Sequence, residues 1–222
     1  MQSQVKNKKT SNIVFFPLLI LVLVLWILYR SLFSFPIWFD EILGKAIFFG
    51  FPVWIYINAT GGDSIINTFD PKKLKSGLLM GIAVGGIFGF VFSILSVIQN
   101  GSVVEAVSLF DSNIFWYEFI LALFTAFWET LLFFSFVMTV IQEKFKSWTM
   151  VSQVLLVASI FLIFHIPNIV LRYELSAILP QMFILFLFAI GQGFLFYSRK
   201  NSFTLVLSHA IWGMVLLVHG GI

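Results

Sequence analysis

Cysteine is absent from this sequence of 222 residues, and charged residues make up only 10% of it. Without cysteine the chain has no disulfide, no thiolate nucleophile, no cysteine-type zinc site and no palmitoylation site. With so few charges and a mean hydropathy of +1.02, it cannot fold as a soluble domain of this length. The longest polar stretch, 58–76, contains only a turn and a loop. The sequence therefore predicts a single integral membrane domain over residues 1–222.

Hydrophobic residues make up 60% of the chain and form runs of about 20 residues, the length that crosses a bilayer as a helix. We therefore predict an all-α, polytopic membrane helix bundle of about seven transmembrane helices. The 29 Phe, seven Trp and five Tyr supply interface anchors and lipid-facing surface. Glycines within 77–89 favour close helix packing. The expected spans are 13–33, 37–58, 76–98, 114–141, 149–171, 177–197 and 202–218.

Two of these spans have an alternative interpretation. The first follows three lysines, as a secretion signal does, but it is too long and ends at Arg30 rather than in small residues, so we expect it to stay uncleaved. The second carries Asp40, Glu41 and Lys45 in its first half. It is therefore either a span or an interfacial helix followed by a short re-entrant or tilted segment.

The basic residues predict the orientation of the bundle. With a cytoplasmic N-terminus, ten of the 13 Lys and Arg lie inside and three outside, which is the usual bias and favours an N-in, C-out topology. The net charge of +3 is small and lies in loops, so it indicates topology and no nucleic-acid binding. The inner residues are Lys6, Lys8, Lys9, Lys72, Lys73, Lys75, Lys144, Lys146, Arg199 and Lys200; the outer ones are Arg30, Lys45 and Arg172.

Three ionisable residues stand within separate apolar spans: Glu129, His165 and His209. An ionisable side chain at membrane depth costs roughly 2.5 kcal/mol or more, so it normally faces a protein interior or a hydrated cavity. Each residue alone has a plain structural explanation as a satisfied buried polar group. Three together favour a shared functional site, and a carboxylate with two imidazoles suits a hydrolase or a metal site.

Around these residues the second half of the chain, about 114–218, resembles the CPBP family of intramembrane proteases. This family comprises CAAX prenyl proteases and bacteriocin-processing proteins and is also called Abi. It carries the motifs EExxxR, FxxxH and HxxxN on three membrane helices. The corresponding segments here are Glu129-Thr130-Leu131-Leu132-Phe133-Phe134, Phe161-Leu162-Ile163-Phe164-His165 and His209-Ala210-Ile211-Trp212-Gly213.

The resemblance has three departures. Thr130 replaces the second Glu of the first motif, Phe134 replaces its Arg, and Gly213 stands where the third motif has Asn. The last change removes a side-chain donor expected near the reacting carbonyl. These changes favour an alternative, that the chain is a catalytically degenerate relative.

The resemblance implies that Glu129 and His165 activate a water for peptide hydrolysis and that His209 supplies a donor to the oxyanion. A second mechanism remains open, in which all three residues ligate a divalent metal such as zinc, with an open position for water. A common site is not evident from span positions alone. Glu129 is near mid-span, while the two histidines lie toward opposite ends, so a shared site requires tilted or shifted helices or a break at Pro167.

We thus predict a CPBP-type intramembrane metalloendopeptidase that acts on a peptide or membrane-protein substrate in the lipid bilayer. The alternative is a membrane peptide-binding, bacteriocin-immunity or regulatory protein without catalysis. A small transporter or channel has less support, because the sequence shows no broken-helix pair in matching halves and no acidic pore ring. The short chain favours a prokaryotic plasma membrane, and the endoplasmic reticulum of a eukaryote is the alternative location. Nothing in the sequence indicates the substrate, the pathway or the oligomeric state.

Overall fold

The computed structural model describes residues 2–101, 114–172 and 174–219, and all regular structure in these ranges is helical. The all-α prediction is confirmed. The elements η1, η2 and η5 are π-helical, and η3 and η4 are 3₁₀ turns. In chain order the elements are α1 (Gln2–Leu32), α2 (Ile37–Phe39), η1 (Asp40–Gly44), η2 (Ala46–Gly50), α3 (Phe51–Thr60), α4 (Asp63–Ile66), η3 (Asn67–Phe69), η4 (Pro71–Lys73), α5 (Leu74–Asn100), α7 (Ile114–Glu129), η5 (Thr130–Met138), α8 (Thr139–Lys144), α9 (Met150–Arg172), α10 (Leu175–Arg199) and α11 (Ser202–His219).

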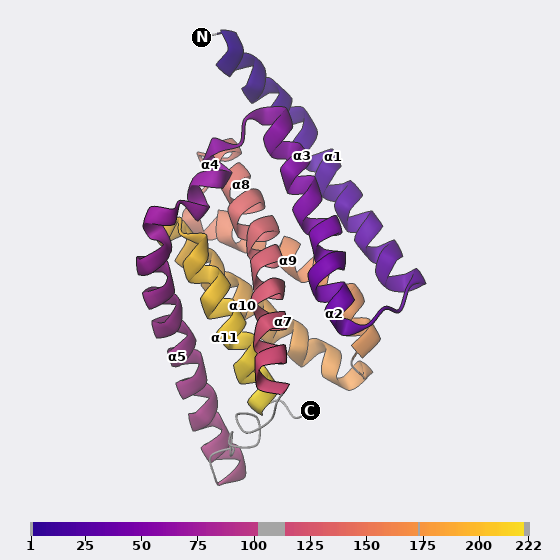
Figure 1. Cartoon of the computed structure of the whole chain (residues 1–222), viewed down its shortest axis with the longest axis vertical. Coiled ribbons are helices and arrows are strands. Elements are labelled where there is room, and N and C mark those ends of the chain that lie inside the picture. Colours follow the sequence, from indigo (N-terminus) through magenta and orange to yellow (C-terminus); the bar gives the residue numbers. More distant parts are fainter. Residues whose placement is uncertain (1, 102–113, 173, 220–222) are drawn as a thin grey trace.

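Within the described residues, six helical segments are long and apolar enough to cross a membrane, so the chain is an integral membrane protein. A seventh apolar helix, Ser202–Leu216, corresponds to the last expected span and is shorter. The long helices alternate in direction, so the start of α1 and the end of α11 lie at opposite ends of the bundle (Figure 1). Which end faces the cytoplasm stays a prediction. The six longer segments are Val14–Leu32, Ile37–Thr60, Asp63–Leu95, Ile114–Lys144, Met150–Leu171 and Leu175–Arg199.

The second span is helical throughout Ile37–Thr60, so the interpretation as a re-entrant segment is not needed. Its charged residues face the protein. Asp40 accepts a hydrogen bond of 2.5 Å from the Tyr29 hydroxyl and forms an ion pair with Arg30. Lys45, expected among the outer charges, is instead buried, with 3% of its surface exposed. These pairings explain how charged residues can lie inside an apolar helix.

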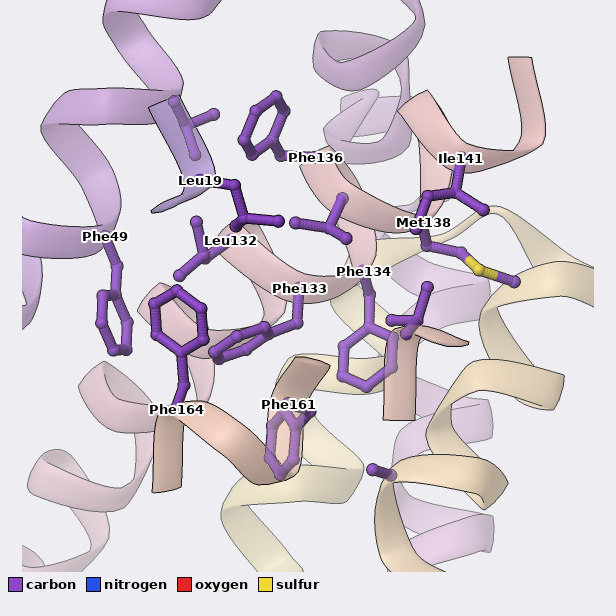
Figure 2. Packing of buried hydrophobic residues seen from close by; sticks show 14 of the residues in the cluster. Leu19, Phe49, Leu132, Phe133, Phe134, Phe136, Met138, Ile141, Phe161 and Phe164 are labelled. Atoms are coloured by element: carbon purple, nitrogen blue, oxygen red, sulfur yellow. The ribbon is translucent and has the colours of Figure 1, made fainter. Parts of the chain in front are cut away.

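Aromatic rings around η5 form the centre of the core (Figure 2). The Phe133 ring lies edge-to-face against those of Phe161 and Phe164 on α9, with centroids 4.9 and 5.2 Å away. It also meets Phe49 on η2 at 5.7 Å. Such edge-to-face pairs are favourable beyond the area they bury. Because these rings come from three different spans, their packing fixes how the second, fourth and fifth spans lie against one another.

A glycine stripe allows α5 to approach α11. Gly81 and Gly85 lie one turn apart on α5, and added Cβ atoms would fall 2.8 Å from the Leu207 Cβ and 2.6 Å from the Ile211 Cδ1. Those distances are shorter than real Cβ contacts, so the helices pack this closely only because no side chain stands at these positions. The expectation that this run serves packing agrees with the structure. Since His209 lies between the two α11 residues, the stripe also positions a candidate site residue.

Candidate active site

The three candidate residues lie together although they come from three helices. The Oε2 atom of Glu129, at the end of α7, is 3.3 Å from the Nε2 atom of His165 on α9. The same Oε2 is 3.5 Å from the Nε2 atom of His209 on α11. Glu129 is buried, with 3% of its surface exposed. Both imidazoles therefore face one carboxylate oxygen inside the protein.

The apparent mismatch in depth disappears because α11 begins inside the bundle. Ser202, its first residue, is fully buried and its hydroxyl lies 2.6 Å from that of Ser135 on η5. From this level, Glu129 lies six residues back along the chain and His209 seven residues on. These offsets are nearly equal and point in the same direction, because the two segments run antiparallel. The contact between Ser135 and Ser202 thus places Glu129 and His209 at the same depth in the bundle.

Phe161 orients His165 in two ways. Its carbonyl oxygen is 2.8 Å from the Nδ1 atom of His165, and its ring stacks on the imidazole with centroids 4.2 Å apart. When Nδ1 donates its proton to that carbonyl, Nε2 is the nitrogen left to exchange protons with groups near Glu129. Farther along α9, the carbonyl oxygen of Phe164 accepts a hydrogen bond of 3.1 Å from the Nε1–H of Trp26. The FxxxH spacing therefore has a direct structural role.

Sequence reasoning missed two residues of the site, Lys45 and Glu41. The ammonium of Lys45 is 2.6 Å from the Oε1 atom of Glu129 and also forms an ion pair with Glu41. The Oε2 atom of Glu41 in turn accepts a hydrogen bond of 2.6 Å from the hydroxyl of Thr125. The available signal was a Glu and a Lys four residues apart within an apolar span. In the sequence this pair bears only on whether the second segment is a span.

A cavity of about 340 Å³ joins these residues. That is at the lower end of the range for ligand pockets. Its wall combines the ionisable site residues with amide and apolar side chains. The lining residues are Ile37, Glu41, Lys45, Glu118, Leu121, Ala122, Thr125, Glu129, His165, Asn168, Ile169, Gln181, Leu185, His209, Trp212, Gly213, Met214 and Leu216.

Two of the three departures from the family motifs lie outside this cavity. Thr130 and Phe134 are fully buried in the apolar core, and neither lines the cavity. The Phe134 ring packs near those of Phe161 and Phe196, with centroids 6.1 and 6.5 Å away. Gly213 does line the cavity, where an added Cβ would contact only the Ala122 Cβ at 3.8 Å. Only this third departure changes the composition of the cavity wall.

The sequence of residues 111–215 matches the family described as Type II CAAX prenyl endopeptidase Rce1-like. This part of the chain is similar to that family, and residues 111–215 are called the Rce1-like segment below. The resemblance to the CPBP family is thereby confirmed for slightly under half of the chain. Glu129, His165 and His209 fall inside the Rce1-like segment, whereas Lys45 and Glu41 precede it. No curated protein sequence and no solved structure matches the chain.

A divalent metal ion fits the site poorly. The Lys45 ammonium lies 2.6 Å from the carboxylate that would have to bind the metal, and it would repel a cation there. The Nδ1 atom of His209 is buried without a hydrogen-bond partner in the described ranges, whereas a zinc-ligating histidine normally donates from its second nitrogen. Within those ranges no three His, Asp or Glu form a metal-binding group. Zinc held by Glu129, His165 and His209 therefore stays the alternative mechanism, and the chemistry below uses side chains alone.

Proposed function

We propose that this membrane protein is an intramembrane endopeptidase that hydrolyses a peptide bond with a water activated by Glu129. The observation that carries the proposal is the convergence of the Nε2 atoms of His165 and His209 on one oxygen of Glu129, inside a cavity of an Rce1-like segment. A buried carboxylate with two imidazoles can accept, hold and return a proton within hydrogen-bond reach.

The reaction follows from the positions of these groups. A water in the cavity gives its proton to Glu129 while its oxygen bonds to the carbonyl carbon of the substrate. His165, held through Nδ1, orients this water with Nε2. The carbonyl π electrons move to the carbonyl oxygen, where His209 donates a hydrogen bond to the new negative charge. Collapse of this intermediate breaks the C–N bond, and the leaving amine takes the proton from Glu129.

The location of the motif changes supports a peptidase over a non-catalytic relative. Thr130 and Phe134 pack in the apolar core, so they remove no polar group from the cavity. Replacing a buried charged pair with apolar residues is often neutral or stabilising. The substrate is a peptide or a membrane-protein segment that enters from the bilayer. A prokaryotic plasma membrane is the location we propose.

The test is cleavage of a library of membrane-presented peptides by the purified protein in proteoliposomes. Glu129→Gln removes the base while keeping its shape, and we expect a loss of about 10²- to 10⁴-fold in rate. His165→Ala and His209→Ala should also abolish measurable cleavage. Glu143→Gln is the matched control, because this exposed carboxylate lies at the end of the same span, away from the cavity. Cleavage that survives any one of the three site substitutions would remove that residue from the mechanism.

Metal dependence is measured on the same samples. We expect cleavage to be insensitive to zinc chelators and purified protein to contain no stoichiometric zinc, since Lys45 occupies the carboxylate. Stoichiometric zinc that is lost together with activity in Glu129→Gln would instead establish the metal mechanism. If well-folded wild-type protein cleaves no peptide in the library but binds some of them, the binding or regulatory function replaces the peptidase.

A further inference from the structure

We propose that Lys45 is a further catalytic group of this site, whose ammonium donates a hydrogen bond to the substrate oxygen that becomes negatively charged. The inference rests on the proposed peptidase function. It adds a residue from outside the Rce1-like segment, on a span that the family match does not cover. The evidence is the set of contacts, the burial and the charge of this one side chain.

The contacts of Lys45 leave it one donor. Its side chain is 4% exposed, yet it lines the same cavity as Glu129 and both histidines. An ammonium has three N–H groups. Among the residues that the structure describes, two acceptors are bonded to it, Oε1 of Glu129 and Oε2 of Glu41. The third N–H is available to an acceptor within the cavity.

Two one-turn pairs hold the ammonium in place. Glu41 and Lys45 lie four residues apart on the second span, and Thr125 and Glu129 lie four residues apart on α7. Contacts between the two pairs, Lys45 to Glu129 and Thr125 to Glu41, connect the four side chains in the order Thr125, Glu41, Lys45 and Glu129. A lysine fixed at both carboxylates does not extend to the membrane surface, as lysines near helix ends usually do. It is preorganised at the site, which is what electrostatic catalysis requires.

Charge moves past Lys45 during the proposed reaction. Glu129 loses its negative charge when it takes the proton of the water, and an equal charge appears on the carbonyl oxygen. A cation bonded to Glu129 lies beside the position that loses the charge and close to the one that gains it. Lys45 is the single Lys or Arg among the described residues that line the cavity, and Gly213 on the same wall has no side-chain donor. The oxyanion therefore has one fixed cation to bind.

Kinetics of Lys45→Met test the role, because Met keeps the length of the side chain and removes the charge. We expect kcat to fall about 10²- to 10³-fold, the usual effect of losing one oxyanion donor, with little change in KM. Exposed Lys72 provides the control Lys72→Met. The double variant Lys45→Met/Glu41→Gln keeps the net charge of the site unchanged. It therefore separates the effect of losing the donor from the effect of an uncompensated buried charge on folding. Cleavage by the folded double variant at the wild-type rate or faster would overturn the proposal.

Chemical restoration of the ammonium sharpens the test. Because the chain has no other cysteine, Lys45→Cys carries a single thiol that 2-bromoethylamine converts into a lysine-like amine. We expect this alkylation to recover kcat, while alkylation with the uncharged reagent iodoacetamide does not. Equal recovery with both reagents would show that Lys45 fills space only.

A second-site substitution distinguishes a donor from a structural cation. Gly213 lies one turn after His209, and an added Cβ there meets nothing closer than 3.8 Å. Gly213→Asn places an amide donor on the cavity wall. In the Lys45→Met background we expect it to restore at least tenfold of the lost kcat. A purely structural role of Lys45 predicts no such recovery.

Binding of a peptide phosphonate, which mimics the charged intermediate, tests Lys45 apart from turnover. We expect wild-type protein to bind it at least tenfold more tightly than Lys45→Met/Glu41→Gln, even if no substrate is found. Tight wild-type binding without cleavage would reject the peptidase function and keep the anion-donor role. Equal binding by both proteins would reject the role of Lys45, whatever the fate of the peptidase function.

Discussion

Replacing Gly85 by alanine should push α11 away from α5. An added Cβ would lie 2.6 Å from the Ile211 Cδ1 and 2.7 Å from its Cβ, which is too close for either helix to stay in place. Overpacking of this kind costs about 1–3 kcal/mol. Gly86 is the matched control, because an added Cβ there meets nothing within 4 Å. Both alanines gain about 1 kcal/mol of helix propensity, so this gain cancels in their difference.

We therefore expect Gly85→Ala to be about 1–3 kcal/mol less stable than Gly86→Ala. For a chain of this length that corresponds to a melting temperature lower by roughly 2–12 °C, taking 2–4 °C per kcal/mol. Thermal unfolding in detergent, followed by circular dichroism, measures the difference. Ile211 lies two residues after His209, so cleavage per folded molecule should also fall in Gly85→Ala alone. Equal or higher stability of Gly85→Ala would refute the close contact of α5 and α11.

Two further predictions concern buried residues away from the reacting atoms. Asp40→Ala removes the acceptor of Tyr29 and leaves Arg30 without its ion partner, so we expect a loss of about 3–5 kcal/mol in unfolding free energy, against little change for the exposed control Asp63→Ala. A small loss in Asp40→Ala would show that this ion pair is open to water. Phe134→Ala empties a fully buried position and should cost about 3–5 kcal/mol, whereas Phe183→Ala, 62% exposed, should cost little. Because Phe134 lies outside the cavity, cleavage per folded molecule should stay near the wild-type rate. A loss of kcat in folded Phe134→Ala would show that this position of the first motif takes part in catalysis.

Two π-helical segments adjoin the residues of the candidate site. Glu129 is the last residue before η5. Glu41 lies within η1, and Lys45 directly follows η1. A π turn inserts an extra residue and shifts the helix face that follows it, and such turns are frequent at functional sites. Here these turns adjoin the residues that form the ion pairs. Periodicity at 3.6 residues per turn does not predict such shifts.

Sequence alone determined the class of the protein and singled out three residues that the structure brings together. Seven apolar runs with few charges can satisfy their backbone groups in a bilayer only as helices, which is why the spans followed from composition and length. Glu129, His165 and His209 were recognisable because an ionisable residue in such a run is costly and therefore rarely incidental. The motif spacing then connected them to a family, and the match over residues 111–215 confirmed it.

Only the tertiary structure decided how these residues meet and what else joins them. The level of His209 depends on a buried helix start and on the contact of Ser202 with Ser135, 67 residues away in the chain. Lys45 reaches Glu129 across 84 residues, and its sequence neighbourhood does not reveal that partner. Contacts between distant side chains depend on the packing of whole helices, through features such as the glycine stripe of α5. Local periodicity determines which residues share one face of a helix, whereas the packing of the helices determines which residues of other helices that face contacts.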